Sequence, residues 1–164
     1  MTQIFLGTDM DYKPLNDGVD HINIYSRGKT QLGRMLSNFY PLPFNHPVYG
    51  VFNTVEGFYY YVSTGFKYEV LRSFSGFEAK KFGKSLERTK LDDFENIIRK
   101  AIRLKIYQNE TLKSLLKTSS LPFGHYYFYG DPDGKYKLFT PKGFEYMVDE
   151  IEKVRDKVKR TNSN

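Results

Sequence analysis

Cysteine and tryptophan are absent from the 164-residue sequence, and histidine occurs only three times. Without cysteine the chain forms no disulfide and no thiolate metal site, which fits a reducing compartment. The spacing of His21, His46 and His125 matches no metal-binding motif, so we predict no metal and no cofactor. No apolar run approaches the roughly 20 residues of a membrane helix, and the first residues lack the basic region of a signal peptide. We therefore expect a cytoplasmic protein without a membrane partner.

Aromatic residues and positive charge are abundant. Tyr and Phe contribute 14 residues each, and the formal net charge is +6. Residues 1–20 contain four aspartates and one lysine, so the other 144 residues contain 24 basic and 15 acidic side chains. A basic, aromatic-rich body fits an anionic ligand such as nucleic acid or a pyrophosphate. A solvated surface over an aromatic core explains the same composition, and composition alone favours that interpretation.

The hydrophobic pattern predicts one helix-dominated α+β domain with a small sheet. We expect an N-terminal extension over residues 1–19, a domain over 20–160 and a frayed tail over 161–164. The segment 26–34 is predicted to be a loop and 130–134 a turn. Strands are expected at 21–25, 48–52 and 125–129, and helices at about 53–66, 68–73, 76–83, 92–108, 110–117 and 142–160.

Residues 25–38 combine glycines, cations and small polar side chains. Gly28 and Gly33 permit close backbone approach, and Lys29 and Arg34 supply charge for a phosphate or carboxylate. This composition predicts a loop that cradles a phosphorylated sugar, although a basic surface turn has the same composition. The candidate binding residues here are Tyr25, Ser26, Arg27, Gly33, Arg34, Ser37 and Asn38.

Two further residues are candidates for chemistry. Glu56 stands three residues after Asn53, in the pattern of a capping box at a helix start. A carboxylate beside several tyrosines is also a candidate for a partly desolvated acid or base, and its position alone does not decide between these roles. His125 begins a predicted strand, where a structural role competes with that of a donor or proton carrier.

Basic side chains also cluster on two predicted helices. A solvated surface is the favoured interpretation, and contact with DNA is the alternative. The residues are Arg99, Lys100, Arg103 and Lys105 on one helix, and Lys153, Arg155, Lys157, Lys159 and Arg160 on the other.

The order and spacing of several segments resemble the NADAR (YbiA-like) family over about residues 22–155. The resemblance implies an α-helical or α+β domain that hydrolyses N-glycosidic bonds. The segments are Ile-Asn-Ile-Tyr-Ser at 22–26, Leu-Gly-Arg-Met-Leu-Ser-Asn-Phe at 32–39, Pro-Leu-Pro-Phe at 41–44, Thr-Val-Glu-Gly-Phe-Tyr-Tyr-Tyr at 54–61, Ala-Lys-Lys-Phe-Gly at 79–83 and Ile-Arg-Leu-Lys-Ile-Tyr-Gln-Asn at 102–109.

Two substrate classes are associated with this family. One branch resembles enzymes that cleave ribosylamino intermediates of riboflavin synthesis, and the other resembles enzymes that remove ADP-ribose from guanine in nucleic acid. The present sequence is similar to the second branch. The riboflavin-type branch has Glu-His where this chain has Glu56-Gly57, and Trp-Gly where it has Tyr129-Gly130.

The resemblance therefore implies an ADP-ribosyl hydrolase that acts on guanine bases in DNA and reverses a toxin's modification. Glu56 and Lys29 are the two candidates for the central catalytic role, the lysine by forming a Schiff base with the opened sugar. Tyr25, Tyr59 and Tyr126 are candidates for stacking on bases, and His125 completes the set. A phage protein that counters host defence would suit these features. An N-glycosidase of a small metabolite and a non-catalytic ADP-ribose or nucleic-acid binding module are the alternatives, and no pattern indicates an oligomeric state.

Overall fold

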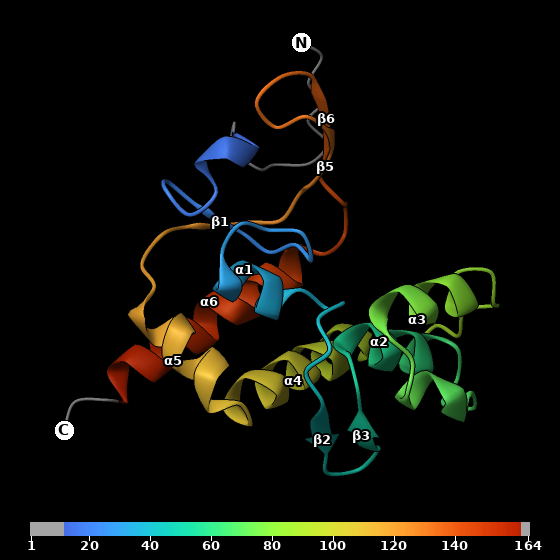
Figure 1. Ribbon diagram of the computed structural model, residues 1–164. Helices are drawn as coiled ribbons and strands as arrows, with labels where there is room; N and C mark the ends of the chain where they lie inside the picture. Colours follow the sequence, from blue (N-terminus) through green and yellow to red (C-terminus); the bar gives the residue numbers. More distant parts are fainter. Residues whose placement is uncertain (1–11, 162–164) are drawn as a thin grey trace. The chain divides into compact units, whose positions relative to one another are not determined.

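The computed structural model describes residues 12–161, which form short strands and longer helices joined by loops (Figure 1). The predicted helix-dominated α+β class is confirmed. Contacts divide the chain into two units, which we describe separately: a first unit of residues up to 37 and from 114 on, and a second unit of residues 38–113. Residues 1–11 and 162–164 lie outside the described residues, and with them most of the predicted extension and tail. The boundaries proposed for the extension, domain and tail stay predictions.

The first unit contains two small pairs of strands. β1 (Ile22–Asn23) runs parallel to β4 (Phe123–Gly124), and β5 (Tyr127–Gly130) forms an antiparallel hairpin with β6 (Tyr136–Phe139). Buried Tyr126, Tyr136 and Leu138 form a core on which Tyr12 and Phe128 pack. The other elements are a 3-10 turn (Pro14–Asn16), α1 (Gln31–Leu36) and α6 (Glu145–Arg160), and the division between the units falls within α5 (Glu110–Thr118).

The last helix of the first unit, α6, carries an apolar stripe that is buried. Met147, Ile151, Val154 and Val158 follow helical spacing, and each is at most 5% exposed. The helix begins at Glu145, three residues later than predicted, and Gly143 just before it has a φ of +85°. Burial of one stripe therefore fixes this helix in its unit.

The second unit is built around α2 (Val55–Ser63). This helix contacts the 3-10 turn η2 (Glu69–Arg72), α3 (Gly76–Gly83) and α4 (Phe94–Tyr107). The antiparallel hairpin of β2 (Phe44–His46) and β3 (Gly50–Phe52) completes the unit. The side chains at its centre are fully buried: Phe52, Val55, Phe58, Val62 and Leu71.

Several predicted elements are corrected. Residues 26–34 are not all loop, because α1 starts at Gln31 with the Thr30 hydroxyl accepting from the Gly33 N–H at 2.9 Å. β2 and β6 were not predicted, and the strand expected at 125–129 begins only at Tyr127. The helix expected to reach residue 66 ends at Ser63, since Gly65 and Phe66 have positive φ angles.

The capping box proposed for Asn53 and Glu56 is wrong. Thr54 is the N-cap residue of α2, and its hydroxyl accepts from the Gly57 N–H at 2.9 Å. The Asn53 side chain instead donates to the Ser73 carbonyl at 3.0 Å. Glu56 is therefore the second residue of the helix, and its carboxyl is not used for the box.

One lysine assigned to a basic surface is buried. Lys105 faces the interior of the second unit together with Ile98, Ala101, Ile102 and Ile106, and it is 3% exposed. Burial lowers its pKa to about 7. The solvated face of α4 therefore does not include Lys105.

Candidate active site

The turn between β1 and α1 is held by a carboxylate that sequence analysis did not single out. Buried Asp17 accepts the Asn23 N–H at 2.9 Å through Oδ1 and the Lys29 N–H at 2.8 Å through Oδ2. Each of these bonds to a charged acceptor is stronger than a bond between neutral groups. Asp17 therefore fixes the backbone of Lys29, and only its placement in an acidic segment marked it in the sequence.

Arg34 stabilises the same loop through two backbone carbonyls. Its Nη1 donates to the carbonyl oxygens of Gly28 and Lys29, both at 2.9 Å. The Lys29 side chain is exposed, and its Nζ donates to the Leu15 carbonyl at 3.0 Å. The predicted cradle thus has a fixed backbone, and within the described residues the Lys29 ammonium forms no salt bridge.

Gly33 lies where no side chain fits. A Cβ added there would be 2.3 Å from the Asn23 carbonyl oxygen, which belongs to β1. We expect Gly33→Ala to lower the free energy of unfolding by about 2–4 kcal/mol, because the backbone of β1 or α1 must move. Urea denaturation measures this change.

Gly134→Ala is the matched control for this substitution. The three atoms nearest to an added methyl there belong to the Asp131 side chain, which can move. We expect a change below about 1 kcal/mol at this position. Equal effects of the two substitutions would show that the close approach of α1 to β1 is not what requires Gly33.

The other predicted residues of this segment differ in exposure. Tyr25 is 8% exposed, and its ring lies 5.3 Å from that of Tyr127 and 5.8 Å from that of Phe128. Burial raises the pKa of Tyr25. Ser37 is buried, Ser26 half-buried and Arg27 exposed. Tyr25 therefore forms part of the aromatic packing of the first unit.

Tyr126 is fixed at both its side chain and its backbone. Its hydroxyl is 2.6 Å from His21 Nε2, and His21 Nδ1 is 2.6 Å from Asp20 Oδ1. The Asn23 side chain donates to the Tyr126 carbonyl at 2.9 Å and accepts its N–H at 3.0 Å. Because Asn23 belongs to β1, these bonds join β1 to the segment between β4 and β5. Tyr126 itself is 1% exposed.

His125 is half-buried at the edge of the Tyr127 and Phe144 rings. Burial lowers its pKa to about 4, against the opposing charge of Glu145. Its imidazole is therefore neutral at physiological pH, where it acts as a hydrogen-bonding group and not as a cation.

Glu56 has the titration behaviour of an acid–base group. It lies in the first turn of α2, and its N–H donates to the Asn38 carbonyl at 3.0 Å, which joins two of the predicted residues. The surrounding protein desolvates the half-buried side chain and raises its pKa to about 7, and the charges of Lys80 and Arg88 oppose this shift. Both protonation states are therefore populated near neutral pH.

Cations and aromatic rings surround this carboxyl in the second unit. The guanidinium carbon of Arg88 is 4.8 Å from the Tyr60 ring centre and 6.0 Å from that of Tyr59. Tyr59 and Tyr60 follow Glu56 by three and four residues, so they share its side of α2. Lys80 and Arg88 were not predicted as site residues, although Lys80 belongs to the segment 79–83 that carries the resemblance.

The predicted site residues fall into two sets. The second unit contains Glu56 with Asn38 and Tyr59, beside Lys80 and Arg88. The first unit contains Tyr25, Ser26, Arg27, Lys29, Gly33, Arg34, Ser37, His125 and Tyr126.

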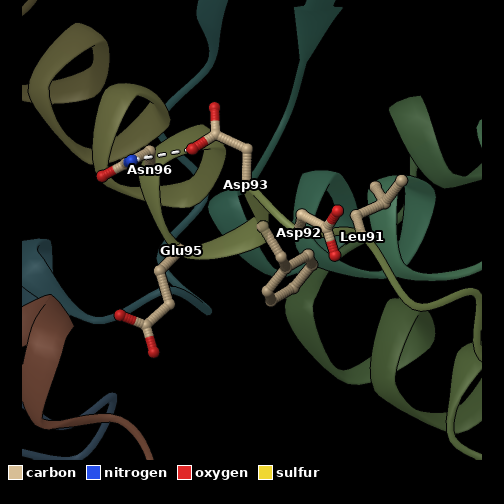
Figure 2. Close-up of a pocket in the computed structure, with 6 residues that line it drawn as sticks. Leu91, Asp92, Asp93, Glu95 and Asn96 are labelled. Carbon is tan, nitrogen blue, oxygen red and sulfur yellow. Dashed lines mark hydrogen bonds between the residues drawn. The ribbon is translucent and has the colours of Figure 1, made fainter.

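A shallow hollow of about 410 Å³ at the start of α4 contains none of the predicted residues (Figure 2). Asp92, Asp93 and Glu95 line it, and Asp93 Oδ1 accepts from Asn96 Nδ2 at 2.7 Å. Three carboxylates repel a pyrophosphate, so this hollow does not suit a nucleotide. Among residues 12–161, no cluster of three potential metal ligands occurs and no helix is long and apolar enough to cross a membrane.

Comparison with known proteins shows the fold. No family model matches the sequence, and no curated protein is detectably similar to it. The structure matches the NMR structure of the E. coli protein YbiA with a TM-score of 0.63 and 20% sequence identity. The match covers 89% of this chain and 94% of the other. The predicted fold is therefore confirmed: the chain is similar in fold to YbiA over most of its length.

Proposed function

We propose that the protein is an N-glycosidase that removes ADP-ribose from guanine bases in DNA. The observation that carries this proposal is Glu56, a carboxyl with a pKa of about 7 near Lys80 and Arg88 and beside two tyrosines. The YbiA-like fold and the NADAR-like segments support the reaction type. The guanine-type pattern of the sequence supports the substrate.

The chemistry proposed for Glu56 follows from the bond that breaks. Positive charge develops on C1 of the ribose as the base departs, and a carboxylate facing that carbon stabilises the charge or activates water. This role requires the ionised form of Glu56. Lys80 and Arg88 favour that form, and they also carry charge that suits the pyrophosphate of ADP-ribose.

Lys29 is the rival candidate for this central role, and it is proposed to attack C1 in place of water and form a covalent intermediate. Opening of the ribose ring converts the link between C1 and an exocyclic guanine nitrogen into an imine. The Lys29 amine then adds to C1, the guanine amine leaves with a proton, and water hydrolyses the lysine imine to release ADP-ribose and the free amine. The fixed backbone of Lys29 and its exposed side chain suit a nucleophile that must reach a large substrate.

The remaining predicted residues are proposed to bind the substrate. Arg34, Ser37 and Asn38 would position phosphates and ribose hydroxyls. Among the candidate tyrosines, Tyr59 is the least buried, so we propose that it stacks on a base. Tyr25 and Tyr126 pack inside the first unit, so we propose no stacking role for them.

The proposed biological role is reversal of toxin-type ADP-ribosylation of DNA, including counter-defence by a phage in the host cytoplasm. Cells that express a guanine-modifying toxin should grow when they also express this protein. If the wild-type protein, at normal expression, leaves the DNA modified and growth inhibited, this role is excluded.

The substrate proposal is tested by a direct comparison. We expect the protein to release ADP-ribose from an oligonucleotide carrying one ADP-ribosylated guanine, at least about 100-fold faster than it cleaves a ribosylaminopyrimidine phosphate. Chromatography of both reactions measures the two rates. Turnover of the pyrimidine alone would establish a metabolite enzyme, and tight binding of ADP-ribose without any cleavage would establish a binding module.

A further inference from the structure

Helix α3 packs one face against the rest of the second unit and exposes another to solvent. Gly76, Ala79 and Gly83 lie on one side of the helix at helical spacing, and all three are buried. An added Cβ at Gly76 would meet Phe39 at 2.5 Å, and one at Gly83 would meet the Tyr60 ring at 2.3 Å. The glycines therefore let this side of α3 lie directly against α2 (Figure 1).

A second, solvent-facing side carries an exposed ring and a row of cations. Phe77, Lys80, Lys81 and Lys84 have the spacing i, i+3, i+4 and i+7, which places them along one stripe. All four are exposed, and the Phe77 side chain is 72% exposed. We call this stripe, with the exposed residues Arg88 and Lys90 that follow it, the α3 basic face.

The charge of this face is hardly neutralised. Among the described residues, none of its five cations forms a salt bridge. Four acidic residues lie close to it along the chain: Glu78, which accepts the Ser75 N–H at 2.9 Å in a capping box, Glu87, and Asp92 and Asp93 just after Lys90. On α6, in contrast, exposed lysines alternate with acids, and Lys153 pairs with Asp149 at 3.1 Å. The α3 basic face therefore carries positive charge that no salt bridge among the described residues neutralises.

The exposed ring favours one kind of polyanion. The Phe77 ring contacts Phe39 edge to face at 5.2 Å between centres, which supports the ring while leaving most of it in water. A supported, exposed ring beside lysines is the combination that binds unpaired bases by stacking and their phosphates by charge. A lipid headgroup or an acidic peptide would use the cations but has no base to stack on Phe77.

We propose that the α3 basic face binds single-stranded nucleic acid and leads the strand to Glu56. Lys80 and Arg88 belong to this face and also act on the Glu56 carboxyl, so the face is electrostatically continuous with the candidate site in the same unit. This inference rests on the proposed function for the identity of the site, and it specifies that a polynucleotide chain is preferred as substrate over a free nucleotide.

The test uses cations outside the candidate site. In the variant K81Q/K84Q/K90Q three exposed lysines become neutral, while Lys80 and Arg88 are kept. The matched control is K153Q/K157Q/K159Q on α6, which removes the same charge from exposed positions. The probe is an unmodified, fluorescently labelled 20-nucleotide single strand, and its Kd is measured by anisotropy between about 25 and 200 mM salt.

We expect the α3 variant to bind at least about 10-fold more weakly than wild type at the lowest salt. Its slope of log K against log salt should fall by about 2, since each phosphate contact on a single strand contributes about 0.7. The α6 control should stay within about twofold of wild type. Phe77→Ala should weaken binding at least about fivefold without changing the salt slope. Thermal melting establishes that all variants are folded.

Any one of three results would overturn the inference. Wild type does not bind the strand, the α3 variant binds it as tightly as wild type, or the α3 and α6 variants lose the same affinity. Binding to phosphatidylserine vesicles that depends on Lys81, Lys84 and Lys90, with no binding of the strand, would assign the face to membranes.

Cleavage assays on two substrates test the proposed function separately from strand binding. The α3 variant should cleave an ADP-ribosylated guanosine mononucleotide at the wild-type rate and a modified oligonucleotide at least about 10-fold more slowly at low substrate concentration. If no substrate is cleaved but the strand binds as described, the proposed function fails and the face stands. If both substrates are cleaved equally by wild type and the variant, the face fails and the function stands.

Discussion

Glu56→Gln is expected to lower kcat for ADP-ribose release by about 10³-fold and to change KM by less than about threefold. Glutamine keeps the size and hydrogen-bonding capacity of the side chain but lacks the negative charge that stabilises C1. Loss of a group that acts in the transition state lowers kcat more than it changes KM. Steady-state kinetics on a modified oligonucleotide measure both constants.

The pH dependence gives a second readout of the same group. The ionised carboxylate is the active form, so wild-type kcat should rise as the pH passes through about 7 and level off above it. Any residual activity of the glutamine variant should lack this inflection. A variant with wild-type kcat, or one that keeps the inflection near pH 7, would show that another residue is the catalyst.

Stability separates a catalytic loss from a folding defect. The pKa of Glu56 is raised in the folded protein from an ordinary value of 4.5 to about 7. The contribution of this group to stability is fully present below about pH 4.5 and is lost as the pH rises through 7. Glu56→Gln should therefore be more stable than wild type at pH 8, by roughly 1–3 kcal/mol, and similar to it at pH 4. A less stable variant at pH 8 would contradict this account of the carboxyl.

Lys29→Arg is expected to lower kcat by about 10²–10³-fold, because arginine keeps the positive charge but cannot form an imine under these conditions. Cyanoborohydride added during turnover should trap ADP-ribose on wild-type Lys29, and peptide mass spectrometry identifies the modified residue. The neighbouring substitution Arg27→Lys, at an exposed position of the same loop, is the control and should retain the adduct on Lys29.

A different result would reassign Lys29. If Lys29→Arg keeps most of the activity and no adduct forms, the lysine acts only through its charge. In that case Glu56 would promote direct attack of water on C1. Loss of activity through misfolding is recognised by thermal melting, which should differ little from wild type because the Lys29 side chain is exposed and makes one bond, to the Leu15 carbonyl.

Elements with long periodic patterns or clear caps were predictable from the sequence. The bounds of α3 agree with the prediction, and α5 begins after Asn109, whose side chain accepts the Leu112 N–H at 2.8 Å. The six residues of α1 are too few to show a period, and β2 and β6 are short strands that pairing defines. The choice of Thr54 over Asn53 as a cap depends on Ser73, which lies twenty residues away.

The candidate site was only partly predictable, because several of its features depend on contacts between distant segments. Glu56 stood out through its place before several tyrosines, but its pKa is raised by burial in the folded unit, against the opposing charges of Lys80 and Arg88, which come from later segments. Asp17 was overlooked because its two bonds, to Asn23 and Lys29, appear only once the chain turns back on itself. Residues that act through packing leave little trace in a single sequence.

The measurement that tests the central claim most directly is the mass of both products from an oligonucleotide with one ADP-ribosylated guanine. With wild type we predict intact ADP-ribose and an oligonucleotide with unmodified guanine, and with Glu56→Gln almost none of either. Release of AMP with a ribose phosphate left on the guanine would mean that the pyrophosphate bond is cleaved, and it would contradict an N-glycosidase.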